Sequence, residues 1–253
     1  MYAEPLIIDD PNDCFFYHFM DLPGVGEVGT QWDLRDSIDA YLGNFDFTGK
    51  RTLDVGTASG YLTFELEKRG ADVVSFDMSD GAQWNIVPHI SIQPILKEIL
   101  HERSLRHQKL RNGYWFAHRT LQSRANVYYG DIYNLPDALG QFDVAVFGMI
   151  LGHLRDPFQA LYSVSRLVTN TIIVTNQTFK TEQPLAAFTP NRDNKIQSVW
   201  WQLSDGCIKT MLGVLGFEIK HIVTCNPICT VKGHEGRDLC TAFVFQRSAQ
   251  FPR

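Results

Sequence analysis

The residues best suited to bind a ligand form one short run, Asp54-Val55-Gly56-Thr57-Ala58-Ser59-Gly60, between an apolar stretch and a helical pattern. Gly56 permits a sharp turn and a close approach of a ligand to the main chain, and free N–H groups at a helix start attract an anionic group. The run lacks the Gly-x-Gly-x-x-Gly spacing of dinucleotide-binding proteins. Asp54 would repel a pyrophosphate but would attract an ammonium or a sulfonium group. We therefore expect a nucleoside ligand with a cationic amino-acid tail rather than NAD.

Two further acidic residues fall at the ends of apolar stretches. Asp77 lies 17 residues after Gly60, near the spacing at which a carboxylate accepts hydrogen bonds from ribose hydroxyls in nucleotide-binding folds. Met78, beside it, offers a polarizable side chain for a purine face. Asp131, within Gly130-Asp131-Ile132, could accept a hydrogen bond from an exocyclic amine. These residues predict a ribose and base site next to the glycine run.

An alternation of strand and helix patterns surrounds these residues. We predict strands over 51–56, 72–77, 126–129, 142–147, 171–175, 217–223 and 240–247, and helices over 59–69, 158–168 and 205–215. Strands that are nearly continuous Val, Ile and Phe and alternate with helices indicate a parallel sheet covered on both faces. The last two strands have no helix between them, so we expect a hairpin with one antiparallel strand at or near an edge.

Three segments are longer than the connections that an alternating α/β domain requires. We interpret residues 1–50 as an N-terminal cap or lid, and residues 51–247 as the main domain, with insertions at 84–125 and 178–203. Long insertions in α/β domains are usually lids or substrate-binding parts. They follow or flank the carboxyl ends of strands, where open α/β sheets bind ligands.

The composition excludes several protein classes. The 253 residues are 44% hydrophobic and 20% charged, which suits a globular chain and not a disordered one. No apolar run approaches the ~18 residues of a membrane span. The first 34 residues contain no Lys or Arg, unlike a secretory signal peptide, and five cysteines is an odd number at no disulfide-framework density. We therefore expect a cytoplasmic protein that does not engage a membrane; its oligomeric state is left open.

The motifs and their order resemble those of class I S-adenosylmethionine (SAM) dependent methyltransferases. The resemblance is carried by the run 54–60, by Asp77 and Asp131, and by Phe142-Asp143-Val144-Ala145-Val146-Phe147-Gly148, and it covers roughly residues 50–247. It implies an α/β fold with a seven-stranded, mostly parallel, doubly wound sheet of order 3-2-1-4-5-7-6, strand 7 antiparallel, with helical cap insertions. The main domain then becomes a SAM-binding methyltransferase domain. Ala58 departs from the family, which most often has glycine there.

A narrower similarity lies in Tyr17-His18-Phe19-Met20-Asp21-Leu22-Pro23-Gly24-Val25, in Trp32-Asp33-Leu34-Arg35 and in Tyr128-Tyr129-Gly130-Asp131-Ile132-Tyr133. These runs are similar to a loose methyltransferase group named after the wobble-uridine tRNA modifying enzymes. Fold relatives in this group act on many acceptors, so the similarity does not name the acceptor.

The resemblance implies roles for individual residues. Asp54, Gly56 and Gly60 would surround the methionine part of SAM, and Asp77 would take the ribose. Met78, Asp131 and Ile132 would frame the adenine. The remaining expected cofactor contacts are Thr57, Ala58, Ser59, Tyr61, Ser79, Gly130, Phe147, Gly148 and Arg35.

Two histidines are candidate catalytic residues. His153 follows the fourth strand, beside the expected position of the transferable methyl group, where a general base would lie. The alternative is a helix-capping or hydrogen-bonded structural histidine. His18 is the second candidate, in an aromatic N-terminal segment with Tyr17. This segment is either a lid over the sulfonium or a hydrophobic element docked on the sheet.

Aromatic residues in the additional segments are candidates for the acceptor site, with packing in the core as the alternative. The expected substrate-binding residues are Tyr17, Trp32, Trp115, His118, Trp200 and Trp201. The stretch 97–124 has seven basic and two acidic residues in a chain of net charge −5. It is either a phosphate-tracking patch or a solvated helix face. Cys225, Cys229 and His234 lack a fourth zinc ligand, so we expect reduced structural cysteines and no metal.

The sequence thus predicts an enzyme that transfers a methyl group from SAM to an oxygen or nitrogen atom of a small-molecule acceptor by direct in-line displacement. One alternative is a tRNA-modifying methyltransferase that uses the basic stretch 97–124. The other is a SAM-binding module without catalysis.

Overall fold

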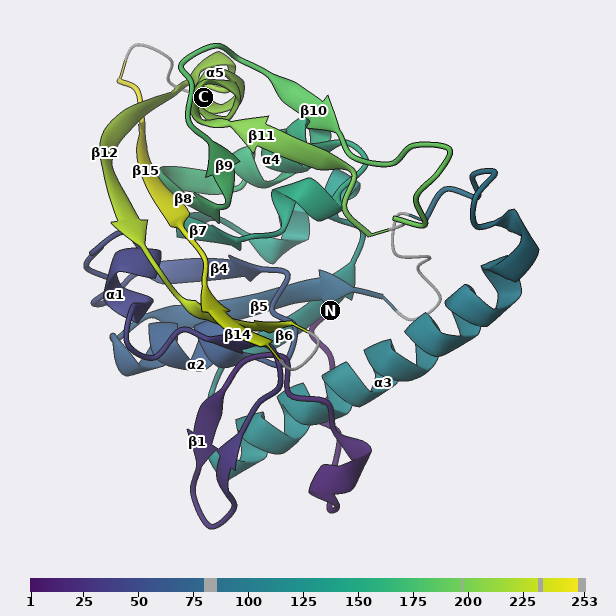
Figure 1. Cartoon of the computed structure of the whole chain (residues 1–253). Helices are drawn as coiled ribbons and strands as arrows, with labels where there is room; N and C mark the ends of the chain where they lie inside the picture. Colours follow the sequence, from purple (N-terminus) through teal and green to yellow (C-terminus); the bar gives the residue numbers. More distant parts are fainter. Residues whose placement is uncertain (80–85, 197, 232–233, 250–253) are drawn as a thin grey trace.

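The structure is a computed structural model that describes residues 1–79, 86–196, 198–231 and 234–249. Its centre is a seven-stranded sheet in the order β12-β15-β8-β7-β4-β5-β6 (Figure 1). These strands are β4 (Arg51–Val55), β5 (Asp72–Met78), β6 (Asn126–Gly130), β7 (Phe142–Gly148), β8 (Val168–Asn176), β12 (Phe217–Cys225) and β15 (Cys240–Arg247). Within this sheet only β15 runs antiparallel to its neighbours. Counted along the chain from the β6 edge, the order is 3-2-1-4-5-7-6, which confirms the predicted fold class.

Helices cover both faces of the sheet. They are α1 (Ile38–Tyr41), α2 (Tyr61–Lys68), α3 (Leu96–Thr120), α4 (Pro157–Ser165) and α5 (Asp205–Val214). Alternate residues of a strand point to opposite faces, so Val144 and Val146 of β7 pack with α1, α2 and α3, while Ala145 and Phe147 pack with α4 and α5. Figure 1 shows the two helical layers on either side of the strands.

Local sequence signals set the helix boundaries. Gly60, with φ of 90°, is not helical, so α2 begins at Tyr61. Asp156 caps α4 by accepting a hydrogen bond from the N–H of Gln159, and Pro157 occupies its first position. The strands and helices predicted from the sequence agree with the structure to within three residues at each end.

The predicted insertion 84–125 contains the 25-residue helix α3; residues 84 and 85 lie outside the described residues. The C-terminal part of α3 packs on the sheet, where Tyr114, Trp115, Phe116 and Ala117 are buried. This part is the covering helix that connects β5 to β6 in the α/β alternation. Only the N-terminal part of α3 projects beyond the sheet (Figure 1).

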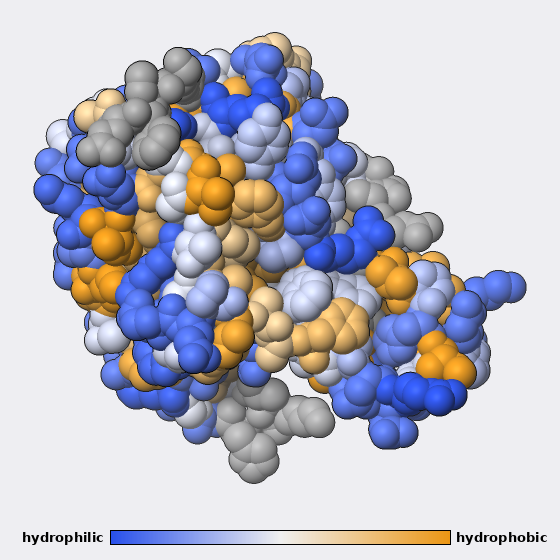
Figure 2. All heavy atoms as spheres, turned by 90° about the horizontal axis from the view of Figure 1, so that it is seen from above, coloured by the Kyte–Doolittle hydropathy of each residue, from blue (hydrophilic) through white to orange (hydrophobic). Residues whose placement is uncertain are grey.

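Short strands form smaller sheets in the additional segments. They are the hairpin β1 (Met20–Leu22) and β2 (Gly26–Val28), the sheet of β3 (Trp32–Asp33), β13 (Ile228–Val231) and β14 (His234–Arg237), and the sheet of β9 (Thr178–Phe179), β10 (Ala186–Phe188) and β11 (Trp201–Ser204). From above, the surface is mostly hydrophilic with separate apolar patches (Figure 2). None of the helices in the described part of the chain has the length and apolarity to cross a bilayer.

Candidate active site

The loop after β4 has a left-handed backbone at three alternate positions. The φ angles are 81° at Gly56, 51° at Ala58 and 90° at Gly60. A Cβ added to Gly56 would lie 2.4 Å from Cδ1 of Ile150, and one added to Gly60 would lie 2.6 Å from the ring of Phe64. Both glycines are therefore favoured by the backbone conformation, and a side chain at Gly56 would in addition require the tip of Ile150 to move. Ala58 adopts the same kind of backbone with a side chain.

A chain of buried hydroxyl groups lies beneath this loop. Thr63 Oγ1 donates to Asp54 Oδ2 at 2.7 Å. Because Thr63 has a single hydroxyl proton, it accepts from Thr57 Oγ1 and from Ser75 Oγ, both at 2.7 Å. Ser75 Oγ in turn accepts from the hydroxyl of Tyr114 at 2.8 Å. Every proton in the chain is thus directed toward one oxygen of Asp54.

The second oxygen of Asp54 has no partner. Oδ1 is buried, and no hydrogen-bond donor of the described residues reaches it. Burial raises the pKa of Asp54 to about 6, although the hydrogen bond from Thr63 acts in the opposite direction. At neutral pH the carboxylate is mainly ionised, with one oxygen lacking a donor. A cationic N–H group of a ligand would supply the missing partner.

Asp77, at the end of β5, is held by two backbone N–H groups. Oδ2 accepts from Ala58 N at 2.9 Å, and Oδ1 accepts from Met78 N at 2.7 Å. The surrounding protein raises the pKa of Asp77, while His107, these two hydrogen bonds and Arg111 lower it. Each carboxylate oxygen can accept more than one hydrogen bond, so both remain able to accept from ribose hydroxyls.

His107 and Arg111 were not predicted as site residues. They lie four residues apart on α3 and face Asp77 closely enough to influence its ionisation. The guanidinium carbon of Arg111 lies 3.7 Å from the centroid of the Tyr129 ring. The only signal in the sequence was the spacing Arg103, His107, Arg111, which places all three on one face of a helix.

The loop after β6 has the features expected of a base site. Asp131 Oδ1 accepts from Tyr133 N at 3.0 Å, and the residue is exposed, so Oδ2 is open to a ligand. Ile132 is buried beneath it. Ser79 N donates to the carbonyl of Gly130 at 3.4 Å, which joins the ends of β5 and β6.

The end of β7 contributes backbone rather than side chains. Phe147 is fully buried in the core, so its ring does not reach the crevice. A Cβ on Gly148 would lie 2.6 Å from Leu62 Cδ1, so a side chain there would require Leu62 to move. His153, in the turn that follows, hydrogen-bonds through Nδ1 to the carbonyl of Ser198. A carbonyl only accepts, so Nδ1 carries the proton and Nε2 keeps a lone pair.

The pKa of His153 is lowered from its ordinary value. The main cause is desolvation by the protein packed around the ring. The hydrogen bond to the carbonyl of Ser198 raises the pKa, and the nearby cation Arg103 lowers it further. The imidazole is therefore neutral at physiological pH. A neutral ring with a free Nε2 can accept a proton.

The N-terminal segment lies directly over the glycine loop. Tyr17 N donates to the buried Ser59 Oγ at 3.0 Å, and the Tyr17 hydroxyl accepts from Trp32 Nε1 at 3.1 Å. The His18 ring centroid is 5.8 Å from that of Tyr61. His18 Nδ1 is buried without a partner in the described residues, and burial lowers the pKa of His18 to about 4. His18 is therefore neutral.

Arg35, an expected cofactor contact, forms ion pairs with carboxylates of the protein itself. Its guanidinium makes ion pairs with Asp33 at 2.6 Å, Glu27 at 2.9 Å and Asp21 at 3.0 Å. Asp21 and Glu27 join Arg35 to the hairpin of β1 and β2, while Asp33 lies on β3. Pairing with the carboxylate of SAM would require Arg35 to release one of them.

The structure separates the predicted aromatic residues of the acceptor site. Trp115 is 2% exposed in the core under α3, and His118 Nε2 hydrogen-bonds to the carbonyl of Ala125 at 3.0 Å. Neither lines the pocket described next. Trp200 and Trp201 do line it.

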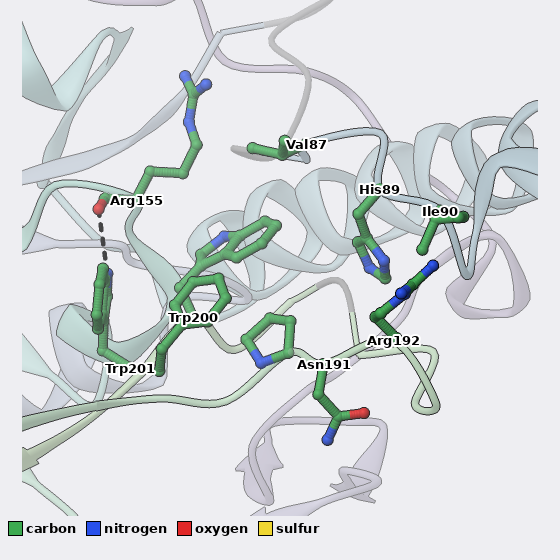
Figure 3. Close-up of a pocket in the computed structure, with 10 residues that line it drawn as sticks. Val87, His89, Ile90, Arg155, Asn191, Arg192, Trp200 and Trp201 are labelled. Atoms are coloured by element: carbon green, nitrogen blue, oxygen red, sulfur yellow. Dashed lines mark hydrogen bonds between the residues drawn. The ribbon is translucent and has the colours of Figure 1, made fainter.

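This pocket has a volume of about 400 Å³ and lies between the segment before α3 and the segment that includes β10 and β11 (Figure 3). The two segments contact each other, since His89 Nε2 bonds to the carbonyl of Ile196 at 2.9 Å. Trp200 N donates to the carbonyl of Gly152 at 2.7 Å, which ties the pocket wall to the turn that contains His153. The pocket is thus next to the candidate base.

The cysteines are all free thiols. Cys225 and Cys240 face each other across β12 and β15, and Cys240 Sγ lies 3.7 Å from Met149 Sδ. Among the described side chains, no three His, Cys, Asp or Glu residues form a group able to hold a metal ion. The imidazole of His234 is outside the described side chains.

Comparison with known proteins gives the family. A family model described as a methyltransferase domain matches residues 30–211. The chain belongs to this methyltransferase family. The predicted class, a class I SAM-dependent methyltransferase, is therefore confirmed, as are an enzymatic function and SAM as cofactor. No curated protein sequence matches the chain.

Solved structures share the fold of this methyltransferase at low identity. The N-terminal domain of EvdMO1, determined in the presence of S-adenosylhomocysteine (SAH) and D-fucose, has a TM-score of 0.57 and 17% identity, and the match covers 92% of this chain and 91% of that one. Magnesium protoporphyrin IX methyltransferase from Synechocystis, with bound SAH, has a TM-score of 0.53 and 17% identity, with 84% and 81% covered. The pyocyanin biosynthetic protein PhzM has a TM-score of 0.52 and 17% identity, with 85% and 56% covered.

The residues of this methyltransferase fit SAM. The buried Oδ1 of Asp54 has no hydrogen-bond donor within the described part of the chain, and the methionine ammonium of SAM could act as that donor. Gly56, with φ of 81°, has the left-handed backbone that favours glycine and brings the main chain of the loop close to the expected ligand. Asp77 and Asp131 are acceptors at neighbouring strand ends, as a nucleoside requires.

Proposed function

We propose that this methyltransferase transfers a methyl group from SAM to an oxygen or nitrogen atom of a small molecule. The observation that carries the proposal is the pocket of about 400 Å³ beside the His153 turn. That volume is within the range of small-molecule sites, about 300–1,000 Å³. Its position after β7 agrees with the rule that open α/β sheets bind ligands at the carboxyl ends of their strands.

In this proposal, three acidic residues hold the cofactor. Asp54 Oδ1 binds the ammonium of the methionine part, Asp77 binds the ribose hydroxyls, and Asp131 Oδ2 binds the exocyclic amine of the adenine. When bound, SAM supplies a methyl group on a positively charged sulfur, already activated for displacement. The loop 56–60 contributes backbone N–H groups at the start of α2.

His153 is the proposed general base. Its Nδ1–H is fixed by the carbonyl of Ser198, which leaves Nε2 to take a proton from an acceptor hydroxyl or protonated nitrogen. His18 is the second candidate, since its ring is neutral and its Nδ1 lacks a partner among the described residues. Correct placement of the acceptor against the methyl group supplies much of the rate, roughly 7–11 kcal/mol in well-oriented systems.

The N-terminal segment 1–50 acts as a cover in this proposal. Tyr17 is hydrogen-bonded to Ser59 of the glycine loop, and Trp32 is hydrogen-bonded to Tyr17. These aromatic residues exclude water from the side of the crevice nearest the loop. Exclusion of water favours a reaction in which a positive charge on sulfur is lost.

The basic stretch 97–124 supports a tRNA acceptor less well. Arg119 pairs with Asp9 at 3.2 Å, and the guanidinium carbons of Arg106 and Arg111 lie 4.6 Å and 3.7 Å from the ring centroids of Phe15 and Tyr129. Cations engaged in this way are less available to phosphates.

The test compares acceptors from one cell extract. The purified enzyme is incubated with SAM and either the small-molecule fraction or the tRNA fraction, and SAH formation is measured by mass spectrometry. We expect SAH, and a product one methylene heavier, only with the small-molecule fraction. Methylated tRNA, with salt-dependent binding weakened by Arg106, Arg111 and Arg119→Ala, would overturn the proposal. No SAH with either fraction, despite SAM binding, would indicate a module without catalysis.

A further inference from the structure

A chain of hydrogen bonds joins helix α3 to the acidic residue at the end of β4. Asp54 and Ser75 are partners in the register of the parallel strands β4 and β5, so their side chains lie on the same face of the sheet. Helices α2 and α3 cover this face and supply Thr63 and Tyr114 (Figure 1). Two strands and two helices thus contribute to one buried group of hydroxyls around one carboxylate.

Tyr114 is the first donor of this chain. Its hydroxyl donates to Ser75 Oγ at 2.8 Å, and Ser75 donates to Thr63 Oγ1 at 2.7 Å. Thr63 then donates to Asp54 Oδ2 at 2.7 Å. Burial raises the pKa of Tyr114 well above its ordinary value of 10, so the phenol keeps its proton at physiological pH. Because an ionised carboxylate only accepts hydrogen bonds, the chain has one direction, from Tyr114 to Asp54.

The ring of Tyr114 also packs against the glycine loop. A Cβ added to Gly60 would lie 2.8 Å from Cδ2 of Tyr114 and 2.6 Å from the ring of Phe64. The centroids of the Tyr114 and Phe64 rings are 5.6 Å apart. Tyr114 therefore has two separate contacts with the expected cofactor site, its ring against Gly60 and its hydroxyl in the chain to Asp54. Replacement of Tyr114 by phenylalanine removes only the second contact.

The hydrogen-bond chain determines which oxygen of Asp54 is left for a ligand. Thr63 holds Oδ2, so Oδ1 is the oxygen that no donor of the described residues reaches. Buried hydrogen bonds in a chain polarise one another, so a donor at the far end strengthens the bond at the near end. Without the hydroxyl of Tyr114, the bond from Thr63 to Asp54 becomes weaker and the carboxylate is held less firmly in this orientation.

From these observations we propose that Tyr114 is a positioning residue of the cofactor site. Acting through Ser75 and Thr63, its hydroxyl holds the Asp54 carboxylate in the orientation in which Oδ1 meets the ammonium group of SAM. The inference rests on the proposed function, in which Asp54 binds that ammonium group. It gives α3 a role in cofactor binding in addition to covering the sheet.

The test compares two ligands that differ in the amino-acid part, SAH and 5′-deoxy-5′-methylthioadenosine. The second ligand has the same adenosine and a thioether sulfur, but no ammonium group for Asp54. Binding of both to full-length Tyr114→Phe is measured by titration calorimetry. We expect SAH to bind about three- to tenfold more weakly than to the wild type, and methylthioadenosine to stay within about twofold. A general loosening of the loop would instead weaken both ligands.

Further variants show whether Tyr114 acts through the chain. Ser75→Ala interrupts the chain one step closer to Asp54 and should weaken SAH by at least the same factor. The double variant Tyr114→Phe/Ser75→Ala should bind SAH no more weakly than Ser75→Ala alone, because Tyr114 acts only through Ser75. Tyr2→Phe is the matched control, since it removes a hydroxyl that accepts a hydrogen bond from Arg51 at 3.1 Å, outside the chain. It should leave both affinities unchanged.

The outcomes separate this inference from the proposed function. Unchanged SAH affinity in Tyr114→Phe, equal weakening of both ligands, or additive losses in the double variant would overturn the inference. If Asp54→Asn weakens SAH but Tyr114→Phe does not, only the inference fails. If Asp54→Asn leaves SAH affinity unchanged, the ammonium site of the proposed function fails as well. Selective loss of SAH affinity in Tyr114→Phe, without a further loss in the double variant, would support the inference.

Discussion

Thr63 donates its single hydroxyl proton to Oδ2 of Asp54, while Oδ1 of the same carboxylate is buried without a partner among the residues that the structure describes. The asymmetry comes from the direction of the hydroxyl chain, in which Tyr114 and Ser75 both donate toward Thr63. An unsatisfied buried polar atom costs about 1–3 kcal/mol. A ligand that brings a cationic donor to Oδ1 removes this cost, which couples cofactor binding to folding stability.

Asp54→Asn should change how stability depends on pH. The folded-state pKa of Asp54, about 6, lies above its ordinary value of 3.8. Between these two pH values the folded protein binds a proton at Asp54 that the unfolded chain has released. The free energy of unfolding therefore decreases as pH rises from about 4 to about 6. The wild type should lose roughly 2–3 kcal/mol relative to Asp54→Asn across that interval. Urea unfolding at several pH values measures it; parallel profiles would contradict the prediction.

Asp77→Ala should weaken SAH binding by a factor of ten or more. The carboxylate that accepts from the ribose hydroxyls is removed, and such charge-assisted bonds contribute roughly 1.5–3 kcal/mol. Asp72→Ala, at the exposed start of the same strand, is the control and should leave the affinity unchanged. An unchanged calorimetric affinity in Asp77→Ala would remove Asp77 from the cofactor site.

Ala58→Gly should stabilise the protein. Ala58 has φ of 51°, a left-handed conformation that costs a residue with a Cβ roughly 1–2 kcal/mol, while glycine costs less there. Subtracting the entropy of the more flexible glycine leaves an expected gain of up to about 1 kcal/mol. Ala138→Gly, at an exposed position without a positive φ, should lose stability instead. A loss of stability in Ala58→Gly as large as in Ala138→Gly would show that the loop is not strained at this residue.

The fold and the outline of the cofactor site could be predicted from the sequence. Alternating strand and helix patterns indicated the order of elements, and the acidic residues at the carboxyl ends of β4, β5 and β6 lie along one edge of the sheet because these strands are parallel. Gly56 and Gly60 have a left-handed backbone, which favours glycine, so the turn can be predicted from these residues alone. These features are encoded within a few residues of one another.

Other features depend on packing between distant segments. Trp115 and Trp200 are equivalent as sequence signals, yet the first is buried under α3 and the second lines the pocket. The rotation of α3 about its axis decides which of its basic residues face Asp77, and this rotation could not be predicted from the sequence. Arg35 was predicted to contact the cofactor, and its three carboxylate partners could not be foreseen because they lie on short strands without a clear sequence pattern.

His153→Gln should lower turnover about 100-fold or more and leave SAH affinity unchanged, because a general base contributes to the reaction and not to cofactor binding. His101→Gln, an exposed histidine on α3, is the control. Equal turnover in His153→Gln would assign the residue a structural role.

The pH profile of the wild-type enzyme gives a second test of the same base. The pKa of His153 lies below its ordinary 6.5, so the imidazole stays neutral until the solution is more acidic than that. The rate should therefore fall only below pH 6.5. A decline that begins above pH 6.5 would point to another group.

His18→Gln should reveal the opposite pH dependence to Asp54→Asn. Burial lowers the pKa of His18 from 6.5 to about 4, so the unfolded chain binds a proton that the folded protein refuses between these values. Relative to His18→Gln, the wild type should lose roughly 2–3 kcal/mol as pH falls from about 6.5 to about 4. A constant difference between the two proteins would mean that His18 has the same pKa in the folded protein as in the unfolded chain.

The two segments that enclose the pocket are joined through carbonyl oxygens: His89 bonds to that of Ile196, Ser91 to that of Arg192, and Trp200 N to that of Gly152. Every amino acid offers a carbonyl, so the side chains at 192 and 196 can be exchanged without breaking the junction. Substitutions at 192 and 196 are therefore expected to leave the enclosure of the pocket intact.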